Sequence, residues 1–196
     1  MPSHGIECVH PCAAYGHDEF GRDSGSSGGV VGTVLITTPL KTEHINEIHQ
    51  LMELGEPYIR ARGLSDYWLY ATLFSSTCPV AFGDNNTITG AVIAFRSQDD
   101  PADVYIQDVM THPRHRRRGI TRALIGSVRS QAEKWDCERL YLTSEPDNRA
   151  AHASWATLGF VNVPGDHEID GISVITDFKG PGRSRAVYEL ALRRPC

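Results

Sequence analysis

The stretch from Val104 to Leu124, VYIQDVMTHPRHRRRGITRAL, constrains the fold more than any other part of the chain. A β-rich run over 104–110 is followed by an arginine-rich loop, and Gly119 then opens the clearest helical pattern of the sequence. Apolar residues recur at helical spacing over 119–135 and would line one face. The stretch therefore predicts a strand that passes through a short basic loop into an amphipathic helix.

The beginning of this helix is a candidate anion site. A helix N-terminus exposes unpaired N–H groups and a partial positive charge, so it suits phosphate groups. Glycine at position 119 lets the backbone approach a ligand without a Cβ in the way. A solvated basic loop or a nucleic-acid patch is the alternative, but the position between a strand and a helix favours phosphate binding. Positive charge is added by Arg114, Arg116, Arg117 and Arg118.

This segment resembles the acetyl-CoA loop of the GNAT superfamily of N-acetyltransferases, whose signature is Gln/Arg-x-x-Gly-x-Gly/Ala. Arg116, Gly119 and Thr121 stand at its three fixed places, and Thr121 departs from the pattern. A second family motif is similar to SEPDNRAAHASWATLGF, Ser144 to Phe160. The resemblance implies acetyl-CoA as the cosubstrate and no metal. The residues that it implies for acetyl-CoA binding are Val109, Met110, Thr111, Arg116, Arg117, Arg118, Gly119, Ile120, Thr121, Asn148 and Trp155.

The second motif departs from the family at Trp155. In the family an asparagine, here Asn148, helps to hold the pantetheine arm, and a tyrosine at the position of Trp155 commonly protonates the leaving thiolate. An indole cannot serve as that acid. The thiolate would leave with help from water, or another residue would act, with Ser154, His152 and Tyr188 as candidates.

Asp108 is the predicted catalytic base. An alkylamine is mostly protonated at pH 7, so a base must take its proton before it attacks. The resemblance places the thioester carbonyl beside this strand, where backbone N–H groups of Val109 or Met110 would stabilise an oxyanion. In a regular strand Gln107 and Asp108 point to opposite faces, and a β-bulge would change which of them faces the site. The alternative is an exposed carboxylate paired with an arginine such as Arg114.

The whole pattern predicts a single α/β domain over residues 30–196, with residues 1–29 as a flexible tail. A twisted, mixed but mostly antiparallel sheet would be flanked by helices, which is a GNAT-like fold. The acidic, glycine-containing segment 166–180 would suit a substrate loop. The other predicted strands cover 30–37, 78–82, 87–96, 139–143, 160–163 and 186–192, and the other predicted helices cover 42–54, 65–73 and 148–158.

Composition excludes several classes of function. A net charge of −5 disfavours nucleic acid and anionic membranes as partners, and no apolar run is long enough to span a bilayer. Five widely spread cysteines predict reduced thiols and a cytoplasmic location. Near the N-terminus a small group of possible ligands matches no standard zinc spacing, so no metal site is expected. That group is Cys8, Cys12, His4, His10 and His17.

The acceptor is predicted to be a small cationic amine. The stretch IQDVMTHPRHRRRGITRALI is similar to aminoglycoside N-acetyltransferases, which implies inactivation of an aminoglycoside antibiotic, with a kasugamycin-type aminosugar as one fit. A competing resemblance, of SDYWLYATLFSSTCPVA to the diaminobutyrate acetyltransferases of ectoine synthesis, implies a small amino acid. A non-catalytic CoA-binding domain and protein N-acetylation stay open, and the family's frequent dimers make a homodimer an option. The weak acceptor-binding candidates are Asp66, Trp68, Glu145 and Asp170.

Overall fold

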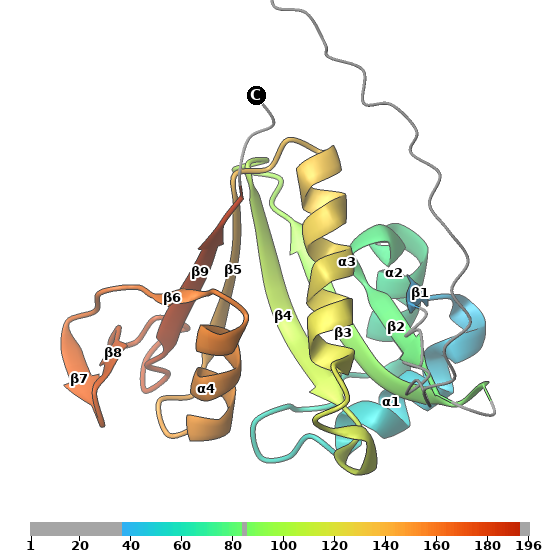
Figure 1. Cartoon of the computed structure of the whole chain (residues 1–196), viewed down its shortest axis with the longest axis horizontal. Coiled ribbons are helices and arrows are strands. Elements are labelled where there is room, and N and C mark those ends of the chain that lie inside the picture. The colour runs from blue at the N-terminus through green and yellow to red at the C-terminus, as the bar shows by residue number, and fades with distance from the viewer. Residues whose placement is uncertain (1–36, 84–85, 193–196) are drawn as a thin grey trace, which may run out of the picture. The chain divides into compact units, whose positions relative to one another are not determined.

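The computed structural model describes residues 37–83 and 86–192, in which helices and strands are arranged around one main sheet (Figure 1). The helices are α1 (Ile45–Glu53), α2 (Leu64–Leu73), α3 (Ile120–Lys134) and α4 (Arg149–Thr157), with short 3-10 turns η1 (Thr42–His44), η2 (Ser75–Thr77) and η4 (Pro113–His115). The strands are β1 (Thr37–Pro39), β2 (Pro79–Phe82), β3 (Ile88–Arg96), β4 (Asp103–Thr111), β5 (Arg139–Ser144), β6 (Val161–Asn162), β7 (His167–Ile169), β8 (Ile172–Val174) and β9 (Ala186–Ala191).

Among the described residues, seven strands form the main sheet in the order β1-β2-β3-β4-β5-β9-β6. Neighbouring strands are antiparallel except β4 and β5, which run parallel. That parallel pair is joined through α3, as a crossover between parallel strands requires. The predicted α/β fold with a mixed, mostly antiparallel sheet is confirmed.

Helices cover both faces of the sheet. On one face, α3 and α4 contribute Leu124 and Trp155 to a buried apolar cluster. On the other face, α1 and α2 contribute Met52 and Tyr67 to a second cluster. We call these two sides the α3 face and the α1 face. The apolar stripe predicted for α3 is confirmed, because its buried residues include Ile120, Leu124, Val128 and Ala132.

Most predicted elements lie within one or two residues of their expected bounds, but the segment 166–180 contains structure that was not predicted. There β7 and β8 form a separate two-stranded hairpin. Its turn is Asp170-Gly171, and both residues have left-handed backbones, with φ of 52° and 77°. An Asp-Gly pair between apolar residues is a known hairpin signal, so the sequence did hold this information.

Some predictions fall on parts of the chain that the structure does not describe. Three predictions lie wholly or mostly outside the described residues: the strand 30–37, the domain boundary at residues 29–30, and the cysteine and histidine group around Cys8. Within the described ranges, no group of three or more His, Cys, Asp or Glu side chains is placed to hold a metal ion. No helix in those ranges combines the length and the apolar character needed to cross a membrane.

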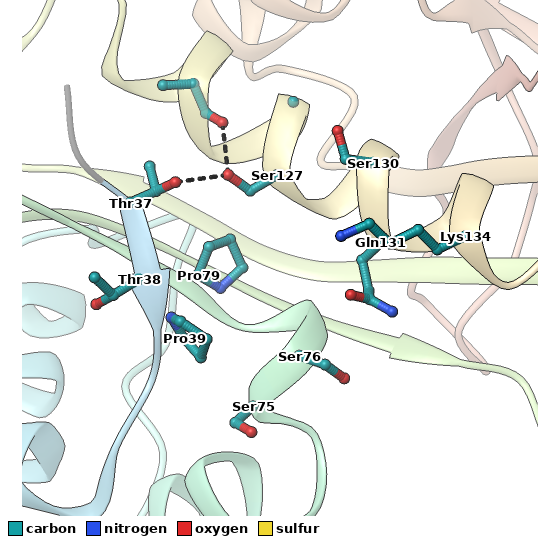
Figure 2. Close-up of a pocket in the computed structure, with 12 residues that line it drawn as sticks. Thr37, Thr38, Pro39, Ser75, Ser76, Pro79, Ser127, Ser130, Gln131 and Lys134 are labelled. Atoms are coloured by element: carbon teal, nitrogen blue, oxygen red, sulfur yellow. Dashed lines mark hydrogen bonds between the residues drawn. The ribbon is translucent and has the colours of Figure 1, made fainter. Parts of the chain in front are cut away.

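A pocket of about 490 Å³ lies between β1, η2 and the outer side of α3 (Figure 2). Its lining is mostly small and hydroxyl-bearing, and the Thr37 and Ser127 hydroxyls hydrogen-bond across it at 2.7 Å. None of the predicted site residues lines this pocket. Most of the predicted site residues lie instead around the start of α3 and along β4.

Gly126 lies on α3 beside this pocket, and its replacement by alanine is expected to stabilise the protein. A Cβ at Gly126 would meet none of the described atoms within 4 Å. Alanine loses less conformational entropy than glycine in a helix, so Gly126→Ala should raise the free energy of unfolding by about 0.5–1 kcal/mol. Urea denaturation measures this change, and a lower unfolding free energy would show that the pocket needs the open space.

Candidate functional site

The N-terminus of α3 has the geometry of an anion site. Gly119 is the N-cap with a left-handed backbone, φ 79°, and no side chain of the described residues caps the helix. The first helical hydrogen bond is the one that the Ala123 N–H donates to the Gly119 carbonyl, at 3.0 Å. The N–H groups of Ile120, Thr121 and Arg122 therefore have no partner within the helix, as at any helix start.

The basic loop before α3 is free to meet an anionic ligand. Arg116, Arg117 and Arg118 are exposed, and none of them has an ion-pair partner in the described part of the chain. Thr121, which departs from the family signature, hydrogen-bonds through its hydroxyl to Thr111 at 3.0 Å. This contact ties the first turn of α3 to the end of β4. Three positive charges and a helix N-terminus thus lie together, as the sequence predicted.

The strands β4 and β5 separate on the side where α3 begins. Their ladder runs from Asp103↔Arg139 to Ile106↔Leu142 and stops there. Figure 1 shows the two strands side by side at one end and apart at the end from which α3 starts. The β5-facing edge of β4 beyond Ile106 is therefore left without a strand partner, and Val109, Met110 and Thr111 lie in this stretch. We call this opening the β4–β5 gap.

The second motif lies across the β4–β5 gap, at the start of α4. Asn148 is the N-cap of α4, and its Oδ1 accepts a hydrogen bond from the Ala151 N–H at 3.1 Å. This bond uses the carbonyl oxygen and leaves the amide N–H groups for a ligand. Trp155 is only 8% exposed, and its Nε1 donates to the Ser144 hydroxyl at 2.8 Å. The indole is therefore a hydrogen-bonded core side chain on the α3 face.

The three candidates for the missing acid are engaged elsewhere. His152 Nε2 lies 3.0 Å from the Pro146 carbonyl, which can only accept, so Nδ1 accepts the Tyr188 hydroxyl proton at 2.9 Å. Burial raises the pKa of Tyr188. The Ser154 hydroxyl donates to the Ala150 carbonyl of its own helix at 2.8 Å. These contacts favour water as the proton source for a leaving thiolate.

A β-bulge lies in the middle of β4. The ladder with β3 pairs Asp108 with Ile93 but pairs Ile106 with Ala94, so Gln107 is an extra residue. A bulge of this kind reverses the alternation of side chains along the rest of the strand. The sequence alone could not say whether β4 has a bulge, and the direction of the Asp108 side chain depends on it.

Packing on either side of the bulge shows the reversal. Ile106 belongs to the cluster on the α3 face, and Val109 also packs there, whereas Met110 belongs to the cluster on the α1 face. Since alternate residues share a face, Asp108 lies on the α1 face with Met110. A regular strand would have continued from Ile106 with Asp108 on the α3 face.

The surroundings of Asp108 change its acidity. The side chain is partly buried, and desolvation raises its pKa above the ordinary 3.8. The charges of Arg62 and Lys179 and a hydrogen bond from Gln107 lower it. No ion pair joins Asp108 to Arg62 or Lys179 in the described chain. A carboxylate whose pKa is raised in this way is a better general base than an exposed one.

Sequence reasoning missed two cations near Asp108. Arg62 precedes α2, and its Nε is buried without a hydrogen-bond partner among the described residues. A buried donor left unpaired typically costs about 1–3 kcal/mol, so it needs an explanation. Lys179 donates from Nζ to the Tyr105 hydroxyl at 2.5 Å. Neither residue belongs to a motif, and only the folded chain brings them to β4.

Two tyrosines of α2 complete this environment. Tyr67 and Tyr70 are buried, with ring centroids 5.8 Å apart in an edge-on arrangement. The Tyr67 hydroxyl accepts a hydrogen bond from the Arg62 backbone N–H at 3.0 Å. Burial is the main cause that raises the pKa of both tyrosines; nearby Asp108 raises it further and Arg62 lowers it. Asp108, Arg62 and the two rings therefore lie near one another on the α1 face.

The predicted acceptor-binding residues have other surroundings. The Trp68 ring is 52% exposed on the outer side of α2. Each of the three acidic candidates has a partner of its own, and none of these contacts involves Asp108. Asp66 accepts from the Gly63 N–H at 3.0 Å, Glu145 pairs with Arg185 at 2.8 Å and Asp170 pairs with Arg149 at 2.5 Å. Their contacts thus give no support to an acceptor site built from these four residues.

Comparison with known proteins gives matches to the part of the chain that contains β4, α3 and α4. A family model described as "Acetyltransferase (GNAT) family" matches residues 45–160. Two curated relatives are L-2,4-diaminobutyric acid acetyltransferases. The protein from Bordetella parapertussis is 30% identical over 111 residues, which are 57% of this chain and 59% of that protein. The protein from Chromohalobacter salexigens is 31% identical over 104 residues, 53% and 54% of the two chains. The chain therefore spans less than two thirds of either relative.

A solved structure with the same fold is the diaminobutyrate acetyltransferase EctA from Paenibacillus lautus, in complex with L-2,4-diaminobutyric acid and coenzyme A. The TM-score is 0.66 at 17% identity, and the match covers 82% of this chain and 96% of that one. At this identity the likeness shows the fold alone.

Proposed function

The chain belongs to the GNAT family of acetyltransferases, and we propose that it transfers the acetyl group of acetyl-CoA to an amino group of a small diamino acid such as L-2,4-diaminobutyrate. The observation that carries the proposal is the geometry of β4. This strand presents Asp108 on the α1 face and a free backbone edge beside the uncapped N-terminus of α3. One strand thus reaches both the base and the predicted anion site.

The residues around the β4–β5 gap fit acetyl-CoA, which supplies the activated acetyl group when bound. Its diphosphate would meet the N–H groups that begin α3 and the side chains of Arg116 to Arg118. Its pantetheine arm would run along the unpaired edge of β4 toward Asn148. The other residues predicted to bind acetyl-CoA stay predictions; they are Val109, Met110, Thr111, Ile120 and Trp155.

On the acceptor side, Asp108 would hold the ammonium group and take its proton, directly or through one water. The freed amine would then attack the acetyl carbon in a ternary complex. The carbon–sulfur bond would break, the nitrogen would lose its second proton to water, and the CoA thiolate would leave and take a proton from water. Backbone N–H groups at Val109 or Met110 would donate to the developing oxyanion. Much of the rate would come from holding the amine and the thioester together. No covalent enzyme intermediate is required, and Cys137 is buried with a raised pKa, which does not suit a nucleophile.

The comparisons favour diaminobutyrate over an aminoglycoside, the two acceptors suggested by the sequence. The curated relatives act, by their names, on diaminobutyric acid. The charges around Asp108 agree, because Arg62 and Lys179 would repel the several ammonium groups of an aminoglycoside. An antibiotic acceptor, which the resemblance of the loop segment had suggested first, is therefore the weaker candidate.

A panel of acceptors tests this proposal. Free CoA thiol would be measured with acetyl-CoA and either L-2,4-diaminobutyrate, an aminoglycoside, a polyamine or a peptide. We expect kcat/KM for L-2,4-diaminobutyrate to exceed that for the aminoglycoside by about 100-fold or more, since charged groups of the site that a wrong substrate leaves unpaired penalise it strongly. The reverse order would restore the antibiotic acceptor. Binding of CoA without thiol release from any amine would indicate a non-catalytic domain.

A further inference from the structure

Arg62 is a half-buried cation, and part of its guanidinium group has no partner among the described residues. Its Nε has no hydrogen-bond partner among the described residues. The backbone of Arg62 is held in place, because its N–H donates to the hydroxyl of Tyr67, a residue that is only 1% exposed, at 3.0 Å. A partly desolvated guanidinium with an unused donor, carried on a backbone that is held in place, is suited to a carboxylate, which it can bind with two parallel hydrogen bonds.

Two positive charges act on the proposed base. Asp108 feels the positive charges of Arg62 and Lys179, yet no ion pair joins it to either of them in the described chain. Lys179 instead lies over the Tyr105 ring, with Nζ 5.2 Å from the centroid. One negative group with two positive groups near it complements a molecule that carries an ammonium beside a carboxylate. It does not complement a molecule that carries ammonium groups alone.

We propose that Arg62 binds the carboxylate of the acceptor while Asp108 holds the amino group that is acetylated, so that the enzyme selects amino acids over amines that lack a carboxylate. This inference rests on the proposed function, which it makes more specific. Arg62 is then a specificity-determining residue, and Lys179 adds attraction from the more exposed side. The carboxylate would complete the hydrogen bonding that the protein leaves open at Nε.

A pair of acceptors isolates the carboxylate. L-2,4-diaminobutyrate and 1,3-diaminopropane carry the same two amino groups on the same three-carbon chain, and only the first has a carboxylate. In the wild-type enzyme we expect kcat/KM to favour the amino acid by about 10- to 100-fold, the range for a charge-assisted hydrogen bond. In Arg62→Gln this ratio should fall by about 10-fold or more, because the variant keeps a donor but loses the charge.

Two further variants guard the interpretation. Arg60→Gln removes an exposed arginine two residues away and should keep the wild-type ratio. Arg62→Lys keeps the charge without the planar fork and should give an intermediate ratio. Thermal unfolding of each variant shows whether it is folded. If Arg62→Gln is not folded, the ratio in Arg62→Lys decides, and a wild-type ratio there contradicts the proposal.

The outcomes separate this inference from the proposed function. A wild-type ratio near one, or an Arg62→Gln variant that loses both acceptors by the same factor, would overturn the role of Arg62 while acetyl transfer stands. Thiol release from neither acceptor would count against the proposed function. In that case calorimetry with L-2,4-diaminobutyrate and CoA still tests Arg62, because binding weakened at least about 10-fold in Arg62→Gln supports it and unchanged binding refutes it.

Discussion

Asp108→Asn should lower kcat/KM for the acceptor by about 10²- to 10⁴-fold, the usual contribution of a general base. The amide matches the carboxylate in size but cannot accept the proton of the ammonium group. Since Asp108 lies on the α1 face and the proposed anion site lies at the start of α3, calorimetry should give a Kd for acetyl-CoA close to that of the wild type. Unchanged turnover would remove Asp108 from the mechanism.

The pH dependence of the wild type provides an independent check on this variant. Burial raises the pKa of Asp108 above 3.8, and only the deprotonated carboxylate can act as a base. The kcat/KM should therefore fall as the pH is lowered through this raised pKa, at a higher pH than an exposed aspartate would require. Asp108→Asn should abolish that acidic limb. Asp99→Asn, at an exposed position between β3 and β4, is the matched control and should keep both the rate and the limb.

Gly119→Val should raise the Kd for acetyl-CoA by about 10- to 100-fold. Gly119 has a φ of 79°, and a β-branched side chain in this region costs about 1–3 kcal/mol, where 1.4 kcal/mol is a factor of ten. The loop would relieve this strain by moving, which would turn the N–H groups of Ile120 and Thr121 away from the diphosphate. The added Cβ would also stand where the backbone is expected to approach the ligand.

A second glycine of the same helix region controls for this substitution. Gly126→Ala alters α3 at a position where the new Cβ meets none of the described atoms within 4 Å, so its Kd should equal that of the wild type. Thermal unfolding confirms that both variants are folded. A folded Gly119→Val protein with wild-type affinity would show that acetyl-CoA does not rest against the start of α3.

Local signals allowed α3 to be predicted from the sequence, and they also suggested the proposed anion site at its start. The strand, the arginine loop, Gly119 and the apolar stripe are neighbours along the chain, and each has its own physical meaning. The left-handed backbone at Gly119 and the contact of Thr121 with Thr111 are details that the structure adds and the sequence analysis did not predict. Recognition of the second motif likewise identified Trp155 as a departure, although its bond to Ser144 is visible only in the structure.

Features that depend on distant partners could not be predicted in the same way. The bulge at Gln107 is a property of the register between β3 and β4, which no local pattern fixes. Arg62 and Lys179 come to Asp108 from separate segments, and single basic residues in loops usually indicate only solvated surface. For the same reason the acidic acceptor candidates, chosen by charge alone, included side chains that pair with nearby arginines, as Glu145 does with Arg185.

If the chain has the proposed function, the separation of β4 and β5 would give the two substrates different entrances. On the proposed function, the thioester comes from the side of α3 and α4, and the amine comes from the side of α1 and α2. The sheet would then separate the two substrates, and only the acetyl group would cross it, between β4 and β5. CoA and the acetylated amine would then leave on the sides from which acetyl-CoA and the amine entered, so neither product would have to leave before the other.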